Sequence, residues 1–219
     1  MLLKKQFSIS ILLSLVFTAC MNNTSNYRIT KEFNKYGVIN QNNNILIKHK
    51  YEKILPFSNG FAIVNNYTNK TGVINYKDEV VLDIIYDSID PFYNNLAIIK
   101  LNGKSGLINR NYQVVIKPIY SKIINYSDGL IVVKKKDKVG CINKRFKLVL
   151  NTNYTNIYPS DTAYRKIVTN NKWGFIDNNC KIVVPIIYDF VEDFYNNKTT
   201  VYKDNKSYNI NTKGKTLLF

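Results

Sequence analysis

The chain has a single histidine, His49, and a single tryptophan, Trp173, among its 219 residues. His49 lies in the segment IKHKY with no paired carboxylate nearby in sequence, so we expect a solvated strand histidine rather than a general base. Cysteine and histidine spacings typical of metal sites, a glycine-rich phosphate loop and a nucleophile elbow are all absent. The sequence therefore predicts no metal, no cofactor and no enzymatic activity.

Segments with the pattern of a long helix are also missing. Hydrophobic residues make up 45% and charged residues 21% of the chain, which is typical of a globular protein. Aromatic residues make up 13%, mostly 17 Tyr and 11 Phe, and they favour strands over helices. At this length one ordinary domain with a hydrophobic core is expected, and its fold class is all-β.

Negative charge is scarce beside positive charge. The chain has 31 Lys and Arg against 15 Asp and Glu, which gives a formal charge of +16 and a pI of about 9.6. Such an excess suits an anionic partner. Because Asn, Lys, Ile and Tyr are frequent throughout the chain, the charge alone says little about which partner.

The N-terminus reads MLLKKQFSISILLSLVFTAC, with two lysines ahead of an apolar run. This pattern is typical of a secretory signal peptide and is too short to span a bilayer. Phe17 is too large for ordinary cleavage after Ala19, whereas the segment from Phe17 to Cys20 resembles the lipobox of bacterial lipoproteins. We predict a signal peptide at 1–19, lipid attachment at Cys20 and a polar tether at 20–26. The protein would then be anchored in the bacterial cell envelope, on the periplasmic or surface side; a secreted form is the alternative.

The rest of the chain is a tandem repeat with a period of about 34 residues. Five glycines, each followed by an apolar residue and Ile, are spaced 35, 34, 34 and 34 residues apart: Gly37, Gly72, Gly106, Gly140 and Gly174. The units are 36–70, 71–104, 105–138, 139–172 and 173–206, with a partial unit at 207–219. Since one unit is too small to bury its own apolar face, neighbouring units have to stack.

Each unit begins with a predicted hairpin. An isoleucine expected on the core face of a strand is followed by Asn or Asp, whose side-chain oxygen can close a tight turn. These pairs are Ile39–Asn40, Ile74–Asn75, Ile108–Asn109, Ile142–Asn143, Ile176–Asp177 and Ile210–Asn211. An apolar run then forms the returning strand. The repeat glycine is expected where a side chain would obstruct a neighbouring strand or where φ is unusual.

The second half of each unit repeats as well. It contains a conspicuous tyrosine, then a short alternating strand, and it ends in lysine. The tyrosines are Tyr51, Tyr86, Tyr120, Tyr154 and Tyr188. We predict about three short antiparallel strands per unit.

The segment KWGFIDNNCKIVVPIIYDFVEDF, residues 172–194, resembles the WG repeat of bacterial proteins. The other units keep the frame but replace the tryptophan. Cys180 stands where the family has a turn glycine, and this glycine survives only as Gly214. The resemblance covers 27–219 and implies a β-repeat scaffold with roles at the envelope or cell surface, without a reaction.

Two arrangements of the units are possible. Stacked hairpins can form an open, solenoid-like array, or a six-bladed propeller-like ring can close with one blade shared between 27–35 and 207–219. The composite blade would lack its middle part, and a 34-residue unit is short for a four-stranded propeller blade. The open array is therefore the expected arrangement, with the ring as the alternative.

The two cysteines of the repeat domain are expected to stay apart. Cys141 occupies an apolar column and should be a small buried residue, whereas Cys180 lies at a hairpin turn and should be an exposed thiol. A disulfide would need the buried side chain to turn outward, so we expect none. Trp173, beside Asp177, is expected to be a structural residue of its repeat.

The lysines that end the units are the best candidates for a binding surface. They are Lys70, Lys104, Lys138, Lys172 and Lys206. Stacking would align them in a basic stripe, to which Trp173 could add an aromatic contact. Alternatively, they are solvated lysines that keep sheet edges from pairing. The expected partners are the membrane through the lipid anchor and, at the stripe, an anionic envelope polymer, a lipid headgroup or an acidic protein. Export makes nucleic acid an unsuitable partner.

The function predicted from the sequence is that of a lipid-anchored, non-enzymatic envelope protein with a binding or scaffold role. The alternative is a glycan-acting envelope enzyme or its accessory subunit. Its site would be sought in the irregular fourth unit, which contains Pro159, Ser160, Asp161 and Arg165.

Overall fold

The computed structural model describes residues 26–125 and 129–217. The predicted signal peptide, Cys20 and nearly all of the tether lie outside the described residues. Within those two ranges the chain forms strands joined by turns and loops, and no helix is present that could cross a membrane.

In the described residues twenty-two strands form six antiparallel sheets, and in each sheet the strands pair in chain order. The first sheet contains β1 (Tyr27–Glu32), β2 (Lys35–Asn40) and β3 (Ile45–Tyr51). The second contains β4 (Lys53–Ile54), β5 (Phe61–Asn65), β6 (Thr71–Asn75) and β7 (Val80–Tyr86). The third contains β8 (Ser88–Ile89), β9 (Leu96–Leu101), β10 (Lys104–Asn109) and β11 (Val114–Tyr120). The fourth contains β12 (Lys122–Asn125), β13 (Leu130–Lys135), β14 (Lys138–Asn143) and β15 (Leu148–Tyr154). The fifth contains β16 (Asn156–Ile157), β17 (Tyr164–Thr169), β18 (Lys172–Asp177) and β19 (Ile182–Tyr188). The sixth contains β20 (Phe190–Val191), β21 (Lys198–Lys203) and β22 (Lys206–Asn211).

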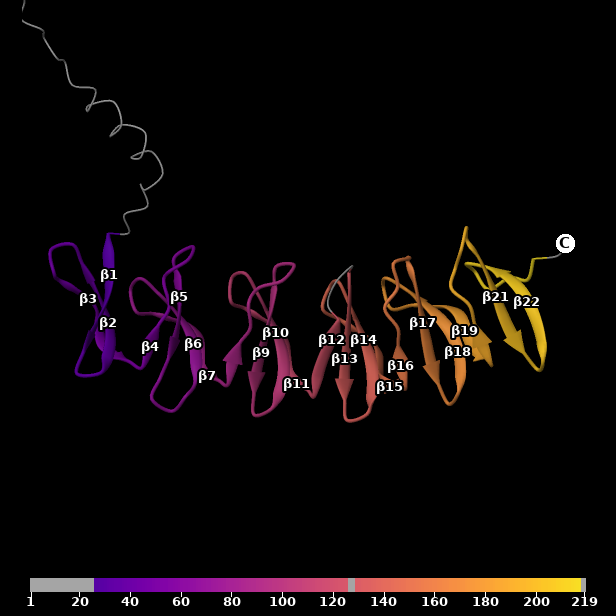
Figure 1. Cartoon of the computed structure of the whole chain (residues 1–219), viewed down its shortest axis with the longest axis horizontal. Helices are drawn as coiled ribbons and strands as arrows, with labels where there is room; N and C mark the ends of the chain where they lie inside the picture. The colour runs from indigo at the N-terminus through magenta and orange to yellow at the C-terminus, as the bar shows by residue number, and fades with distance from the viewer. Residues whose placement is uncertain (1–25, 126–128, 218–219) are drawn as a thin grey trace, which may run out of the picture.

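The six sheets stand side by side in an open row (Figure 1). The first and sixth sheets lie at opposite ends of this row, and β1 and β22 each pair only within their own sheet. The predicted all-β open array is therefore confirmed, and the ring alternative is not formed.

The sheets are offset from the sequence units by half a repeat. A complete sheet combines the second half of one unit with the hairpin of the next, and it has four strands rather than the predicted three. The additional strand follows the repeat tyrosine and is only two residues long in most sheets, as in β4 and β8. A strand of two residues is too short to show alternation in the sequence.

The predicted polar turns close the hairpins in all six sheets. In the fifth sheet Asp177 Oδ1 accepts hydrogen bonds from the backbone N–H groups of Asn179 and Lys181, at 2.8 and 2.9 Å. Asn40, Asn75, Asn109, Asn143 and Asn211 accept the same pair of bonds in their turns. The third residue after each of these side chains has positive φ; in the fifth sheet this is Cys180, at 64°. We call these turns the Asx turns.

The repeat glycines allow a close approach between two paired strands. A Cβ on Gly106 would lie 2.5 Å from the carbonyl oxygen of Ile116, and one on Gly174 would lie 2.6 Å from that of Val184. The pairing is irregular at this point, because the neighbouring strand bulges toward the glycine. Obstruction of a neighbouring strand, rather than unusual φ, is thus the reason for glycine at these positions.

The hydrophobic core is divided among the five interfaces between adjacent sheets. Consecutive residues of a strand point to opposite faces, so in the second to fifth sheets the residue after the repeat glycine packs on the following sheet and the next isoleucine packs on the preceding one. Phe175 and Ile176 illustrate this, since they lie in the clusters on either side of the fifth sheet. Burial of each such apolar side chain stabilises the stack by about 1.5–3 kcal/mol.

Candidate functional site

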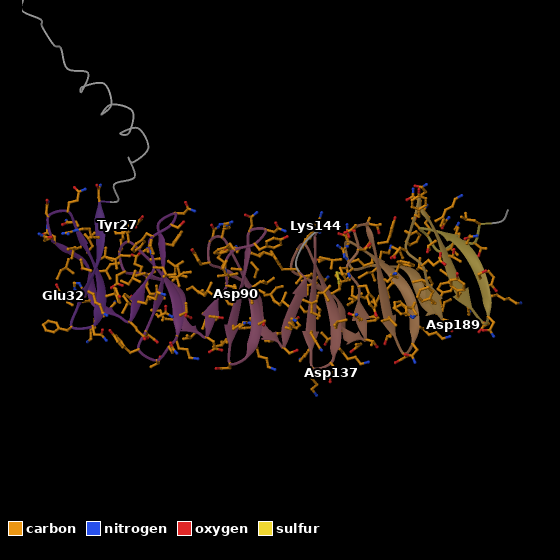
Figure 2. All side chains as sticks on the ribbon, viewed as in Figure 1. Tyr27, Glu32, Asp90, Asp137, Lys144 and Asp189 are labelled. Carbon is orange, nitrogen blue, oxygen red and sulfur yellow. A yellow bond between two sulfur atoms is a disulfide. The ribbon has the colours of Figure 1, made fainter. Side chains whose placement is uncertain are left out.

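The five lysines of the predicted stripe lie in equivalent hairpins. Lys70 directly precedes β6, whereas Lys104, Lys138, Lys172 and Lys206 are the first residues of β10, β14, β18 and β22. These hairpins follow one another along one long side of the row, the lower side in Figure 1. Figure 2 labels Asp137, the neighbour of Lys138, on this side. We call the side that carries these five lysines the lysine edge.

Two of the five lysines are paired with aspartates. Lys70 Nζ lies 2.5 Å from Asp87 Oδ1, and Lys172 Nζ lies 2.5 Å from Asp189 Oδ1. Each aspartate follows the last strand of a sheet, where the chain crosses to the next sheet. The second carboxylate oxygen of Asp189 accepts the backbone N–H of Asp204 at 2.9 Å, so this residue links the fifth and sixth sheets.

These contacts shift the pKa values of the paired groups. The hydrogen bond from Lys172, followed by that from the Asp204 backbone, holds the pKa of Asp189 below its ordinary value. Lys70 acts in the same way on the pKa of Asp87. The hydrogen bond to Asp189 in turn raises the pKa of Lys172, so both partners stay charged at neutral pH.

Lys104 and Lys138 have no such aspartate. The positions equivalent to Asp87 and Asp189 are occupied by Ser121 and Thr155 in their units. Within the described part of the chain no carboxylate forms an ion pair with Lys104 or Lys138, and both lysines are exposed. The middle of the lysine edge therefore carries positive charge that its own repeats do not neutralise.

Trp173 is held between aromatic neighbours. Its ring stacks on Tyr158 with centroids 5.3 Å apart and meets the edge of Phe190 at 5.9 Å. It is half-buried and packs against the cluster between the fifth and sixth sheets. Packing thus accounts for Trp173, as expected of a structural repeat residue, and much of its ring is covered by the protein itself.

The expectation that Cys141 and Cys180 stay apart is wrong. They form a disulfide with an S–S distance of 2.01 Å and a Cα–Cα distance of 5.8 Å, and both residues are fully buried. Cys180 is therefore not an exposed thiol. Its Asx turn directs the side chain into the interface with the preceding sheet, where Cys141 lies in the same cluster. Neither cysteine is available as a nucleophile or metal ligand in this state.

The expectation of a solvated histidine is also wrong. The side chain of His49 is only 8% exposed: its Nε2 lies 2.8 Å from Thr30 Oγ1 and its Nδ1 lies 3.4 Å from Glu32 Oε2. The ring crosses Gly37, whose missing side chain leaves room for it. Glu32 is a neighbour across the sheet rather than along the sequence, so the sequence spacing did not reveal the pair.

This polar trio lies on the face of the first sheet that points away from the second. The equivalents of Thr30 and His49 in the next sheet are Val64 and Ile84, which are apolar. Polar residues at these positions let the end face of the row contact water, as terminal units of stacked repeats require. We therefore interpret the Thr30–His49–Glu32 trio as part of an end cap.

The irregular fourth unit gathers three of its four singled-out residues around one shallow cavity. Ser160, Asp161 and Arg165 line about 360 Å³ together with Asn178, whereas Pro159 is not part of the lining. Arg165 is 1% exposed and donates a hydrogen bond from Nη1 to Asn178 Oδ1. The hydroxyl of Ser160 contacts Thr162 at 2.9 Å, which is no general base. These contacts hold the loop together.

A larger groove lies between the first two sheets, and the sequence reasoning did not identify it. It has a volume of about 810 Å³ and is lined by Asn26, Tyr27, Leu46, Phe57, Ser58, Asn59 and Tyr76. Tyr27 is labelled in Figure 2 on the side of the row opposite the lysine edge. The sequence signal was Tyr76, an aromatic residue directly after the turn asparagine, where other units have Gln41, Arg110, Lys144, Asn178 or Thr212.

Among residues 26–125 and 129–217, no group of three His, Cys, Asp or Glu side chains is placed to hold a metal ion. The described residues instead include a basic edge and an aromatic groove.

A family model described as "WG containing repeat" matches residues 36–67, 72–104, 106–138 and 173–206, which together are more than half of the chain. These segments are the first, second, third and fifth units of the repeat. The fourth unit is not among the matched segments, in line with its irregular sequence.

Several solved structures are similar to this chain at low sequence identity. The computationally designed Ika8 protein is 10% identical with a TM-score of 0.30, over 88% of this chain and 70% of that chain. PorZ, a bacterial surface component of the type-IX secretion system of Porphyromonas gingivalis, is 10% identical with a TM-score of 0.34; the match covers 86% of this chain and only 30% of PorZ. BamB from Moraxella catarrhalis is 7% identical with a TM-score of 0.31, over 84% of this chain and 66% of BamB. None of the curated proteins compared with the chain matches it.

Proposed function

Because this chain belongs to the family of proteins with WG-containing repeats, we propose that it uses its stacked repeats as a binding surface. In this proposal it is a lipid-anchored, non-enzymatic protein of the bacterial cell envelope. Its lysine edge binds an anionic partner of the envelope, such as a charged polymer, lipid headgroups or an acidic protein.

The observation that carries the proposal is the absence of the pairing aspartate in the middle of the lysine edge. In two units Asp87 and Asp189 form an ion pair with this lysine. Ser121 and Thr155 replace that aspartate in two consecutive units, which leaves Lys104 and Lys138 exposed. A purely structural edge would gain from neutralisation, whereas a binding edge needs accessible cations.

Three further lysines, which come shortly before Lys138 in the sequence, add positive charge to the lysine edge. Lys134 and Lys135 end β13, and Lys136 lies in the turn that leads to Lys138. Lys134 lies 3.9 Å from Asp137, the single acidic residue of this hairpin. Cations on consecutive sheets present an extended row, which suits a polymer or a headgroup surface better than a small anion.

The lysine edge is tested by binding to vesicles of phosphatidylcholine with or without phosphatidylglycerol, using chain from residue 20 onward with Cys20→Ala so that no lipid contributes. Each lysine near an anionic surface contributes about 1 kcal/mol. The double variant Lys104→Gln/Lys138→Gln should therefore bind roughly 30-fold more weakly. Retention should also fall as salt is added.

The matched control is Lys144→Gln/Lys213→Gln. It removes the same charge from two exposed lysines in Asx turns, and Figure 2 labels Lys144 on the side opposite the lysine edge. Equal weakening by both double variants would mean that net charge, rather than the lysine edge, governs binding. An anionic soluble polymer such as polyphosphate, tested in the same way, separates polymer binding from headgroup binding.

The anchor is tested separately by metabolic labelling with palmitate in a bacterial host. The wild-type chain should incorporate the label and move to the membrane fraction, because the lipid is attached to the Cys20 thiol. The Cys20→Ala variant should incorporate none. Equal labelling of the two chains would contradict lipid attachment at this residue.

A further inference from the structure

The groove between the first two sheets contains a preorganised aromatic cluster. The rings of Phe57 and Tyr76 stack with centroids 4.4 Å apart and an interplanar angle of 15°. Tyr27 meets Phe57 edge-on at 5.2 Å, and its hydroxyl accepts the backbone N–H of Phe57 at 3.2 Å. The loop that carries Phe57 is thereby fixed to the first sheet, and Tyr76 is held in place by a ring behind it. Tyr76 is nevertheless 47% exposed.

The polar lining of the groove is neutral. It consists of the amides of Asn26 and Asn59 and the hydroxyl of Ser58, together with the tyrosine hydroxyls. None of the seven lining residues is charged, in a chain with a formal charge of +16. A groove of this composition offers no electrostatic advantage to an anion. A purely apolar ligand would leave the amides without partners.

The cluster is a local departure from the repeat. In the next interface the position of Tyr76 is occupied by Arg110, whose guanidinium lies over the ring of Phe92 at 4.9 Å. The cavity there is only about 300 Å³ and includes both Arg110 and Asp90 in its lining. Of these two interfaces, the first is the one with a wide, uncharged aromatic groove. A local violation of a repeat pattern is expected at functional sites.

We propose that this groove binds a neutral glycan chain. Sugar rings present flat C–H faces that pack on an aromatic ring, and their hydroxyls exchange hydrogen bonds with amide and hydroxyl side chains. Tyr76 backed by Phe57 supplies the stacking surface, and Asn26, Ser58 and Asn59 supply donors and acceptors. The volume of about 810 Å³ lies within the range of small-ligand sites and is sufficient for a short segment of oligosaccharide.

This glycan site is independent of the lysine edge. The Asx turn that carries Tyr76 and the start of β1 both lie on the side of the row labelled by Tyr27 and Lys144 in Figure 2, opposite Asp137. The two surfaces differ in chemistry as well, since one is cationic and the other neutral. An anionic partner and a glycan could therefore be bound at the same time.

The experiment measures binding of neutral oligosaccharides of glucose, N-acetylglucosamine, mannose and galactose by calorimetry and by saturation-transfer NMR. The protein is again chain from residue 20 onward with Cys20→Ala. At least one series should bind, with affinity that rises with chain length and changes little with salt. Tyr76→Ala should weaken binding roughly tenfold, because the stacking surface is lost.

Three further variants keep the result interpretable. Tyr76→Phe retains the ring and should bind within about twofold of wild type, whereas Tyr76→Arg installs the residue that the next repeat tolerates and should lose binding without loss of folding. Tyr112→Ala, which alters the adjacent interface, should leave binding unchanged.

Absence of binding by every neutral series would overturn the proposal, and so would equal binding by Tyr76→Ala and wild type. An acidic saccharide series is measured in parallel. Binding of that series alone, lost in high salt and in Lys104→Gln/Lys138→Gln, would also overturn the proposal and would support the lysine edge instead. Conversely, loss of vesicle binding in that double variant with unchanged glycan binding separates the two surfaces.

Discussion

At the scale of the residue, the positive-φ position of the Asx turns in the second, third and fifth sheets carries a side chain that contacts the sheet before it. Only the last turn has glycine here, Gly214. The contacts of Asp78, Tyr112 and Cys180 with the preceding sheet offset the cost of about 1 kcal/mol or more for a left-handed non-glycine residue. Asp78 accepts the hydroxyl of Tyr51 at 2.6 Å, and Cys180 bonds to Cys141. Burial of the ring raises the pKa of Tyr51, and the hydrogen bond to the Asp78 carboxylate raises this pKa further.

The repeat glycines are required for a different reason, which is the close approach of the neighbouring strand. Two glycines of one hairpin, Gly103 and Gly106, distinguish close approach from positive φ as the cause. Gly106→Ala should destabilise the protein by about 1–3 kcal/mol, because the new methyl group meets the Ile116 carbonyl at 2.5 Å. Gly103 has φ of 70°, and a Cβ added there would have nothing within 4 Å. Gly103→Asn should therefore be nearly neutral, as Asn171 has φ of 57° at the equivalent position. Chemical denaturation measures both, and equal losses would contradict the close-approach explanation.

At the scale of the element, adjacent sheets are joined by side chains from turns as well as by their apolar faces. The disulfide ties the fourth sheet to the fifth, and Asp189 ties the fifth to the sixth. Sequence reasoning placed Cys180 outside the core because turns are usually exposed. The Asx turn of the fifth sheet is an exception, since its positive-φ residue, Cys180, points back across the interface. The pairing of Cys141 with a residue one repeat and a turn away could not be read from the period alone.

The disulfide should contribute substantially to stability. It closes a loop with a sequence separation of 39, for which the chain-entropy relation gives about 4 kcal/mol. Cys141→Ala/Cys180→Ala should therefore lower the free energy of unfolding by about this amount. Dithiothreitol should lower the stability of wild type similarly and leave the double variant unaffected. A reductant effect of equal size on the double variant would contradict the assignment.

At the scale of the whole molecule, the row of sheets depends on local features, which the sequence predicts, and on contacts between strands, which it does not predict. The period, the hairpin at each repeat glycine and the Asx turns depend on local residues such as Gly174 and Asp177, so they were predicted. The pairing of Lys172 with Asp189 and of His49 with Glu32 depends on how strands lie beside one another, and it required the structure. The groove at Tyr76 required it too, because a single aromatic residue gives no sign of the space around it.

An open row of sheets distributes stability differently from a closed ring. Each sheet contacts only its neighbours, so stability is a sum of local terms and a defect at one interface stays there. Phe175 is 1% exposed and lies in the cluster between the fifth and sixth sheets. Phe175→Ala should cost about 3–5 kcal/mol at that interface.

Native-state hydrogen exchange detects where this cost is felt. Amides of β20, β21 and β22 should exchange much faster in Phe175→Ala, because the sixth sheet loses its only apolar interface among the described residues. Amides of β4 to β11, which lie in the second and third sheets, should keep their wild-type protection. In a ring the first and sixth sheets would share an interface, and the loosening would reach β1 to β3 from the other side. Faster exchange in β1 to β3 with β8 to β11 unchanged would therefore contradict the open row.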